Sequence, residues 1–143
     1  MVARGFVRRM IAALAGPWML LAFASPAAAQ QPPTSKATAT PAFEKLKGRW
    51  LRDSGGYTIE IRSVGPDGKL EAAYFNPKSI HVGKAQASQQ GGVLKVFIEL
   101  RDVNYPGSTY TLAYDAKSDR LVGRYFQAVA RETFDVYFVR LKP

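Results

Sequence analysis

The stretch Val93–Leu100 (VLKVFIEL) decides the fold class, because its apolar and polar residues alternate. Leu94, Val96, Ile98 and Leu100 fall on one face of an extended chain, and the residues between them fall on the other. Successive side chains of a strand point to opposite faces, so this pattern predicts a strand with one face against a core. No segment of the chain keeps a strong helical period over three turns. The sequence therefore predicts an all-β fold.

The same alternation recurs on both sides of this stretch. Alternating runs occur at Tyr57–Arg62, Leu70–Tyr74, Tyr110–Tyr114 and Phe134–Arg140, and weaker strand patterns at Arg49–Leu51, Ile80–Ala87 and Leu121–Gln127. Turn-forming residues separate the runs, at Pro66–Gly68, Asn76–Pro77, Gly91–Gly92, Tyr105–Gly107 and Asp115–Asp119. Short connections pair sequential strands antiparallel, and closure of the sheet removes its exposed edges. Residues 42–143 are therefore predicted to form an eight-stranded antiparallel up-and-down β-barrel.

Residues 1–29 have the pattern of a secretory signal peptide. Three arginines precede an uncharged, mostly apolar run, Met10–Ala24, and small residues then lead to an expected cleavage after Ala29. The apolar run is short for a bilayer span, and no cysteine follows that could carry a lipid. We expect a periplasmic or secreted protein without a stable membrane anchor. The Arg8–Arg9 pair leaves both the general secretory and the twin-arginine routes open.

Composition limits the chemistry of the remaining chain. Residues 30–41 are rich in Gln, Pro, Thr and Ala, which is typical of a flexible linker. The net charge of the 143 residues is +9, and removal of three arginines with the signal leaves 17 basic and 11 acidic groups, or +6. These charges are interspersed, so no nucleic-acid partner is expected. With no cysteine and one histidine, His81, no metal site and no cofactor are expected.

The two ends of the predicted barrel carry short motifs, Phe43-x-x-Leu46-x-Gly48-x-Trp50 and Phe134-x-Val136-x-Phe138-x-Arg140. Together they resemble the calycin superfamily, which includes lipocalins, fatty-acid-binding proteins and avidin-like proteins. The resemblance implies that a short helical turn at Pro41–Leu46 leads into Gly-x-Trp on the first strand. It also implies that Arg140 on the last strand stacks over Trp50 as a structural lock. No ligand is implied, because the aromatic pattern of biotin contacts is absent.

Tyrosines are the first candidate for a ligand site. Five of the seven fall on the expected inner faces of strands: Tyr57, Tyr74, Tyr110, Tyr114 and Tyr125. Buried phenols need hydrogen-bond partners, which would suit a polar cavity. An eight-stranded barrel can equally be filled by its own side chains, and the sequence leaves this choice open.

The connection Glu99–Thr109 is the second candidate, with Asn104 and Tyr105 at its centre and Tyr74–Pro77 as an expected neighbour. Loops at a barrel mouth often carry binding residues, but this segment also has the composition of an ordinary turn.

Catalysis has weaker support. His81 lies near Ser79 on one strand face, but no nucleophile elbow is present, and the carboxylate pairs Asp115/Asp119 and Glu99/Asp102 flank turns. We therefore expect a non-enzymatic, exported barrel that binds a small, partly apolar ligand in its interior. The alternative is a protein-interaction or inhibitor module of the cell envelope that acts through its loops. A second copy of the chain or an envelope protein is the corresponding candidate partner.

Overall fold

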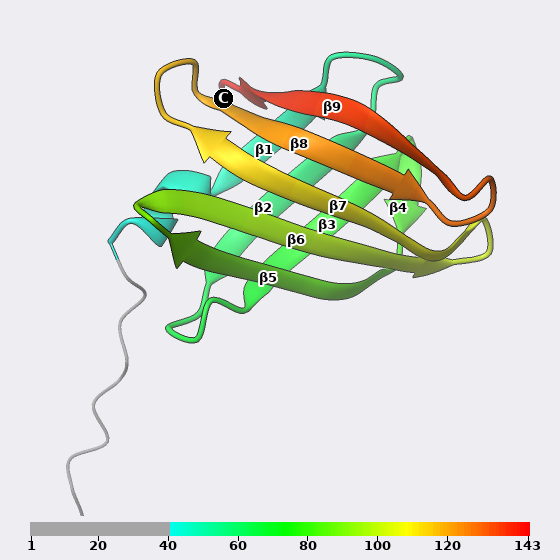
Figure 1. Ribbon diagram of the computed structural model, residues 1–143, viewed down its shortest axis with the longest axis horizontal. Coiled ribbons are helices and arrows are strands. Elements are labelled where there is room, and N and C mark those ends of the chain that lie inside the picture. Colours follow the sequence, from blue (N-terminus) through cyan, green and yellow to red (C-terminus); the bar gives the residue numbers. More distant parts are fainter. Residues whose placement is uncertain (1–40) are drawn as a thin grey trace, which may run out of the picture. The chain divides into compact units, whose positions relative to one another are not determined.

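The computed structural model describes residues 41–143, which form one antiparallel sheet of nine strands curled into a nearly closed barrel (Figure 1). The expected signal segment, residues 1–29, and residues 30–40 of the expected linker lie outside the described residues. The short turn expected at Pro41–Leu46 is the 3₁₀ helix η1 (Phe43–Leu46). The strands are β1 (Gly48–Arg52), β2 (Thr58–Val64), β3 (Leu70–Asn76), β4 (Lys78–Ile80), β5 (Val82–Gln90), β6 (Val93–Asp102), β7 (Tyr105–Asp115), β8 (Arg120–Gln127) and β9 (Glu132–Leu141).

Pairing of the first strand with the last closes most of the barrel. The strand order is β4-β3-β2-β1-β9-β8-β7-β6-β5, so β1 lies between β2 and β9 (Figure 1). Trp50 on β1 is opposite Ile59 on one side and Arg140 on the other. All strand pairs are antiparallel, and every pair except β1 with β9 joins strands that follow each other in the chain through a short connection. The two remaining edges, of β3 with β4 and of β5, face each other.

The expected count of eight strands is wrong, because the single strand predicted at Ile80–Ala87 is two strands. After the turn at Asn76–Lys78, β4 pairs with β3 for only three residues. The chain then changes partner at His81, whose carbonyl accepts a hydrogen bond from the Arg101 amide at 2.9 Å. From Val82 onward, β5 pairs with β6. The alternation runs across this change of partner, so the sequence pattern does not reveal the break.

The turn expected at Tyr105–Gly107 is also displaced. These residues begin β7, and the reversal occurs at Val103 and Asn104. The Asp102 carboxylate stabilises this tighter turn by accepting hydrogen bonds from the backbone amides of Val103, at 2.8 Å, and His81, at 2.9 Å. Backbone hydrogen bonds of this kind lower the pKa of Asp102. The turn places Asn104 and Tyr105 at one mouth of the barrel.

The opposite end of the barrel is packed solid. Inward side chains of the strands form one core, and Phe43 and Leu46 of η1 join it. The alternating burial of β6 repeats the alternation of VLKVFIEL. Through the whole core, from this end to the mouth, the largest side chains with almost no exposure are Trp50, Tyr74, Tyr110, Phe138, Leu46, Ile59, Ile61, Ile98, Leu100, Leu112, Leu121 and Val96.

The contact between Trp50 and Arg140 is present at this packed end. The Arg140 guanidinium carbon lies 4.0 Å from the centroid of the Trp50 ring, and the indole Nε1 donates to the Leu46 carbonyl at 2.9 Å. Arg140 also donates to the carbonyls of Lys47 and Lys45, and through Nε and Nη2 to the Asp119 carboxylate at 2.8 and 3.0 Å. The guanidinium therefore connects β9, β1, the end of η1 and the β7–β8 turn.

Two backbone features make room for this arrangement. Gly48 has φ of +128°, and a Cβ there would lie 2.9 Å from Arg140 Nη1, so the Gly-x-Trp spacing keeps the guanidinium path clear. Asp119 has φ of 48°, a left-handed conformation that Asp tolerates better than most residues. This conformation accompanies the bidentate contact of its carboxylate with Arg140.

Trp50→Ala removes the largest side chain of the packed end. We expect the free energy of unfolding to fall by about 3–5 kcal/mol, the usual cost of truncating a buried aromatic residue to alanine. Chemical denaturation measures it. Phe126→Ala is the control, because Phe126 is 37% exposed, and it should cost much less. Unchanged stability of Trp50→Ala would show that the lock does not hold the barrel.

Asp119 should make stability depend on acid pH. Hydrogen bonding from Arg140 lowers the pKa of Asp119, so this carboxylate stabilises the fold at neutral pH. That contribution is lost as pH falls from the ordinary carboxyl range through the lowered pKa. Thermal unfolding as a function of pH should show a shallower acid decline for Asp119→Asn than for the wild type. Asp135→Asn, at a 94% exposed side chain, is the matched control and should retain the wild-type decline.

Candidate functional site

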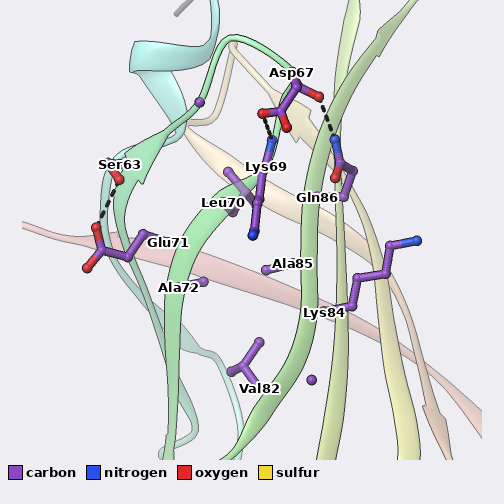
Figure 2. A pocket seen from close by; sticks show the side chains of 12 residues that line it. Ser63, Asp67, Lys69, Leu70, Glu71, Ala72, Val82, Lys84, Ala85 and Gln86 are labelled. Carbon is purple, nitrogen blue, oxygen red and sulfur yellow. Dashed lines mark hydrogen bonds between the residues drawn. The ribbon is translucent and has the colours of Figure 1, made fainter.

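Two hollows on the described part of the barrel are candidates for a functional site. The larger, of about 650 Å³, is a slot between β3 and β5 (Figure 2). The smaller, of about 190 Å³, lies in the barrel mouth among tyrosines and is the more enclosed of the two. They differ in chemistry, so size alone does not identify the functional site.

The slot exists because, among the described residues, the backbones on its two sides are tied at one end only. Beside the β2–β3 turn, the Ala87 amide donates to the Gly68 carbonyl at 2.7 Å, and Lys69 and Gln86 form an isolated bridge. Within the described residues, no ladder pairs join residues 70–73 to 82–85. Figure 2 shows Leu70, Ala72, Val82 and Ala85 between the two strands. The charged lining residues comprise two acids and two bases, Asp67, Glu71, Lys69 and Lys84, so the slot has no marked charge preference.

The smaller hollow, which we call the tyrosine pocket, combines phenols, amides and one guanidinium. Its lining residues are Arg52, Tyr57, Tyr74, Asn76, Asn104, Tyr105, Tyr125 and Gln127. They come from β1, β3, β7, β8 and the β1–β2 and β6–β7 turns, so the pocket requires both halves of the sheet. The Asn76 amide donates to the Tyr105 hydroxyl at 2.5 Å, which connects the β3–β4 turn to the start of β7 across the mouth.

A buried pair of phenols forms the floor beneath the pocket. The Tyr74 and Tyr110 hydroxyls are 2.9 Å apart, and the Tyr110 ring is stacked on Tyr125 with centroids 4.5 Å apart. Burial, with Tyr110 beside it, raises the pKa of Tyr74 well above its usual range. Burial likewise raises the pKa of Tyr110 to about 12, against the lowering effect of its bond with Tyr74 and of nearby Arg52. Both groups are therefore neutral hydrogen-bonding phenols at physiological pH.

The structure brings most of the predicted site residues together. Tyr57, Tyr74, Asn104, Tyr105 and Tyr125 line the tyrosine pocket.

Two predicted residues lie elsewhere. Tyr110 lies below the pocket, in the core. Tyr114 lies nine residues after Tyr105 on β7, about 30 Å along an extended chain, at the packed end. There its hydroxyl donates to the Asp119 carboxylate at 3.0 Å.

Sequence reasoning missed Arg52 and Gln127. Arg52 follows Trp50 by two residues, and Gln127 follows Tyr125 by two, so simple alternation places both on the inner face. Neither residue is among the site residues expected from the sequence. The alternation was therefore a signal for both residues. Polar residues on an inner face can be recognised as part of a site only when the structure shows which strand ends form the mouth of the barrel.

The residues considered for catalysis do not converge. Ser79 and His81 are exposed on the strand-switch segment. Glu99 pairs with Arg101, Asp102 caps backbone amides, and Asp119 binds Arg140. Among residues 41–143, no three His, Asp or Glu side chains gather in a way that could hold a metal ion. The same residues contain no helix with the length and apolar character needed to cross a bilayer.

The buried phenol pair should produce a sharp alkaline limit to stability. Because its pKa is raised to about 12, Tyr110 contributes stability that is complete below pH about 10 and is lost as pH rises toward 12. Tyrosinate absorbance and circular dichroism should therefore change together for the buried fraction of tyrosines. In the Tyr74→Phe/Tyr110→Phe double variant, unfolding should move to higher pH. Titration of all seven tyrosines in the folded barrel would contradict this arrangement.

Comparison of the chain with known protein families, curated proteins and solved structures finds no match. The site is therefore interpreted from its own geometry.

Proposed function

We propose that the protein is an exported barrel that binds a small ligand in the tyrosine pocket. The observation that carries this proposal is a partly enclosed hollow of about 190 Å³ at the barrel mouth, which is lined by four tyrosines, three side-chain amides and one guanidinium. Convergent polar groups in a concave, aromatic-lined site are typical of ligand recognition. The volume suits a compact molecule, whose rings or chain would contact the tyrosines and whose polar atoms would meet the amides.

Sequence features support the wider setting of this proposal. The signal-like pattern of residues 1–29 supports export to the periplasm or beyond, with cleavage near Ala29. The passage from η1 into Gly48-x-Trp50, with Arg140 stacked on Trp50, supports a relationship to the calycins. Binding is favoured over catalysis because Ser79 and His81 are exposed and do not line the pocket.

The second candidate is a protein-interaction module. The slot favours it, because the backbone edges of residues 70–73 and 82–85 have no ladder partner across the gap. An extended segment of an envelope protein could pair with such an edge as an added strand. This candidate differs from the loop-mediated interaction expected from the sequence, since the free backbone belongs to strands.

Native mass spectrometry of the protein purified from its own host distinguishes the two candidates. We expect a retained small molecule on the wild type. Asn104→Trp should lose it, because Asn104 lies on an exposed turn and lines the pocket, so the indole fills the hollow without disturbing the core. Lys117→Trp, the same change on the exposed β7–β8 turn, is the matched control and should retain it.

A small molecule that stays bound to Asn104→Trp would contradict binding in the tyrosine pocket. Retention of a protein with no small molecule would favour the interaction module.

A further inference from the structure

The guanidinium of Arg52, at the barrel mouth, has a buried nitrogen whose hydrogen-bonding capacity is not used by the protein. Its Nε is buried and has no hydrogen-bond partner among the protein's own atoms, and no other buried side-chain nitrogen or oxygen in residues 41–143 is in this state. Buried polar groups in native proteins are nearly always satisfied, and an exception calls for an explanation such as a bound partner. Arg52 ends β1, and its backbone amide is already engaged with the Tyr57 carbonyl at 2.8 Å, so the side chain is anchored at its base.

Two aromatic rings hold the guanidinium in the pocket. Its carbon lies 5.0 Å from the centroid of Tyr57 and 5.6 Å from that of Tyr125, on β8. Cations within about 6 Å of a ring centroid are attracted to the ring. These contacts orient the group but supply no hydrogen-bond acceptor for Nε.

No negative charge in the pocket balances Arg52. The eight lining residues include no carboxylate, and none of the ion pairs among the described residues involves Arg52. The other polar groups there are amides and phenols, which are neutral and able to donate hydrogen bonds. A partly buried positive charge without a counter-ion is costly, so the pocket favours a ligand that brings a negative charge.

We propose that the tyrosine pocket binds a small organic anion, with the Arg52 guanidinium as the anchor for its carboxylate. The planar guanidinium presents donors that match a carboxylate in a bidentate contact. The donors of Asn76, Asn104 and Gln127 are close enough to line the same hollow, and Tyr57 and Tyr125 offer faces for the ligand's apolar part. A hollow of about 190 Å³ has room for about six waters at about 30 Å³ each, which limits the ligand to one ring or a short chain. This inference rests on the proposed function and specifies its ligand class.

Matched probes test the charge requirement. Benzoate and benzamide have nearly the same shape and differ in charge, and phenyl phosphate tests whether a phosphate replaces the carboxylate. Titration of each into the purified full-length protein, followed by calorimetry and by thermal shift, should give a dissociation constant for benzoate at least tenfold lower than for benzamide. Tight binding of phenyl phosphate with weak binding of benzoate would reassign the anion and overturn the carboxylate part of the proposal.

Variants of Arg52 test the anchor itself. Arg52→Gln should lose the tenfold preference for benzoate, and Arg52→Lys, which keeps the charge without the bidentate geometry, should retain part of it. Arg124→Gln, at an exposed arginine on the outside of β8, is the control and should behave as the wild type.

A readout without ligand separates an anchor from a structural residue. If Arg52 serves to bind an anion, its charge is uncompensated in the ligand-free protein. Arg52→Met removes that charge and should therefore leave the unfolding temperature unchanged or raise it. A marked fall in the unfolding temperature of Arg52→Met would mean that Arg52 serves the fold, and would overturn the inference.

The remaining outcomes distinguish failure of the anion anchor from failure of the proposed ligand-binding function. Equal binding of benzoate and benzamide, unaffected by Arg52→Gln but abolished by Asn104→Trp, would overturn the anion anchor and leave small-ligand binding intact. If no probe binds and no small molecule is retained from the host, both the anchor and the proposed function are wrong.

Discussion

Pairing of β1 with β9 is the contact on which the rest of the structure depends. Without this pairing, strands β1–β4 and strands β5–β9 would form two separate sheets. The first strand pairs with the last over four residue pairs, Arg49–Arg52 with Phe138–Leu141, and this joins them into one curled sheet. At this joint the Arg140 guanidinium lies over Trp50 and also binds Asp119 and two carbonyls near η1. Closure encloses an interior, and the tyrosine pocket exists only because residues from both halves of the sheet then face one another.

The two ends of this interior differ in how their polar groups are paired. At the packed end, polar groups are satisfied by each other: the indole donates to Leu46, and Tyr114 and Arg140 share the Asp119 carboxylate. At the mouth, the phenol pair of Tyr74 and Tyr110 separates the apolar core from the pocket, and above it Arg52 keeps an unpartnered nitrogen. Within the described residues, the one buried side-chain atom without a partner therefore lies at the mouth. This agrees with the ligand site that we propose, because a site that receives a ligand must leave groups free.

Much of the fold follows from period-two patterns that are local. VLKVFIEL becomes part of β6, and the runs at Tyr57, Leu70, Tyr110 and Phe134 all lie in strands. The split at His81 could not be predicted, because it is a change of pairing partner, and partners are chosen by contacts distant in sequence. The slot could not be predicted either, because it results from the same change of pairing partner between β4 and β5.

The site was predictable in part for the same physical reason. Alternation tells which side chains point inward, so five predicted residues line the pocket. It does not tell the height of a residue along the barrel, which is why Tyr114 belongs to the opposite end. Alternation alone could not assign Arg52 to the site. That assignment also needs the knowledge that this charged inner-face side chain lies at the mouth and not in the apolar core.

Residue-resolved amide hydrogen exchange tests the central claim, closure of the barrel between β1 and β9, most directly. The account predicts that the paired amides of Arg49–Arg52 and Phe138–Leu141 exchange as slowly as those in the centre of the β6–β7 pair. The amides of residues 70–73 and 82–85 that point into the slot should exchange much faster. Exchange between β1 and β9 as fast as along the slot would contradict closure, and with it the enclosed mouth from which the function is inferred.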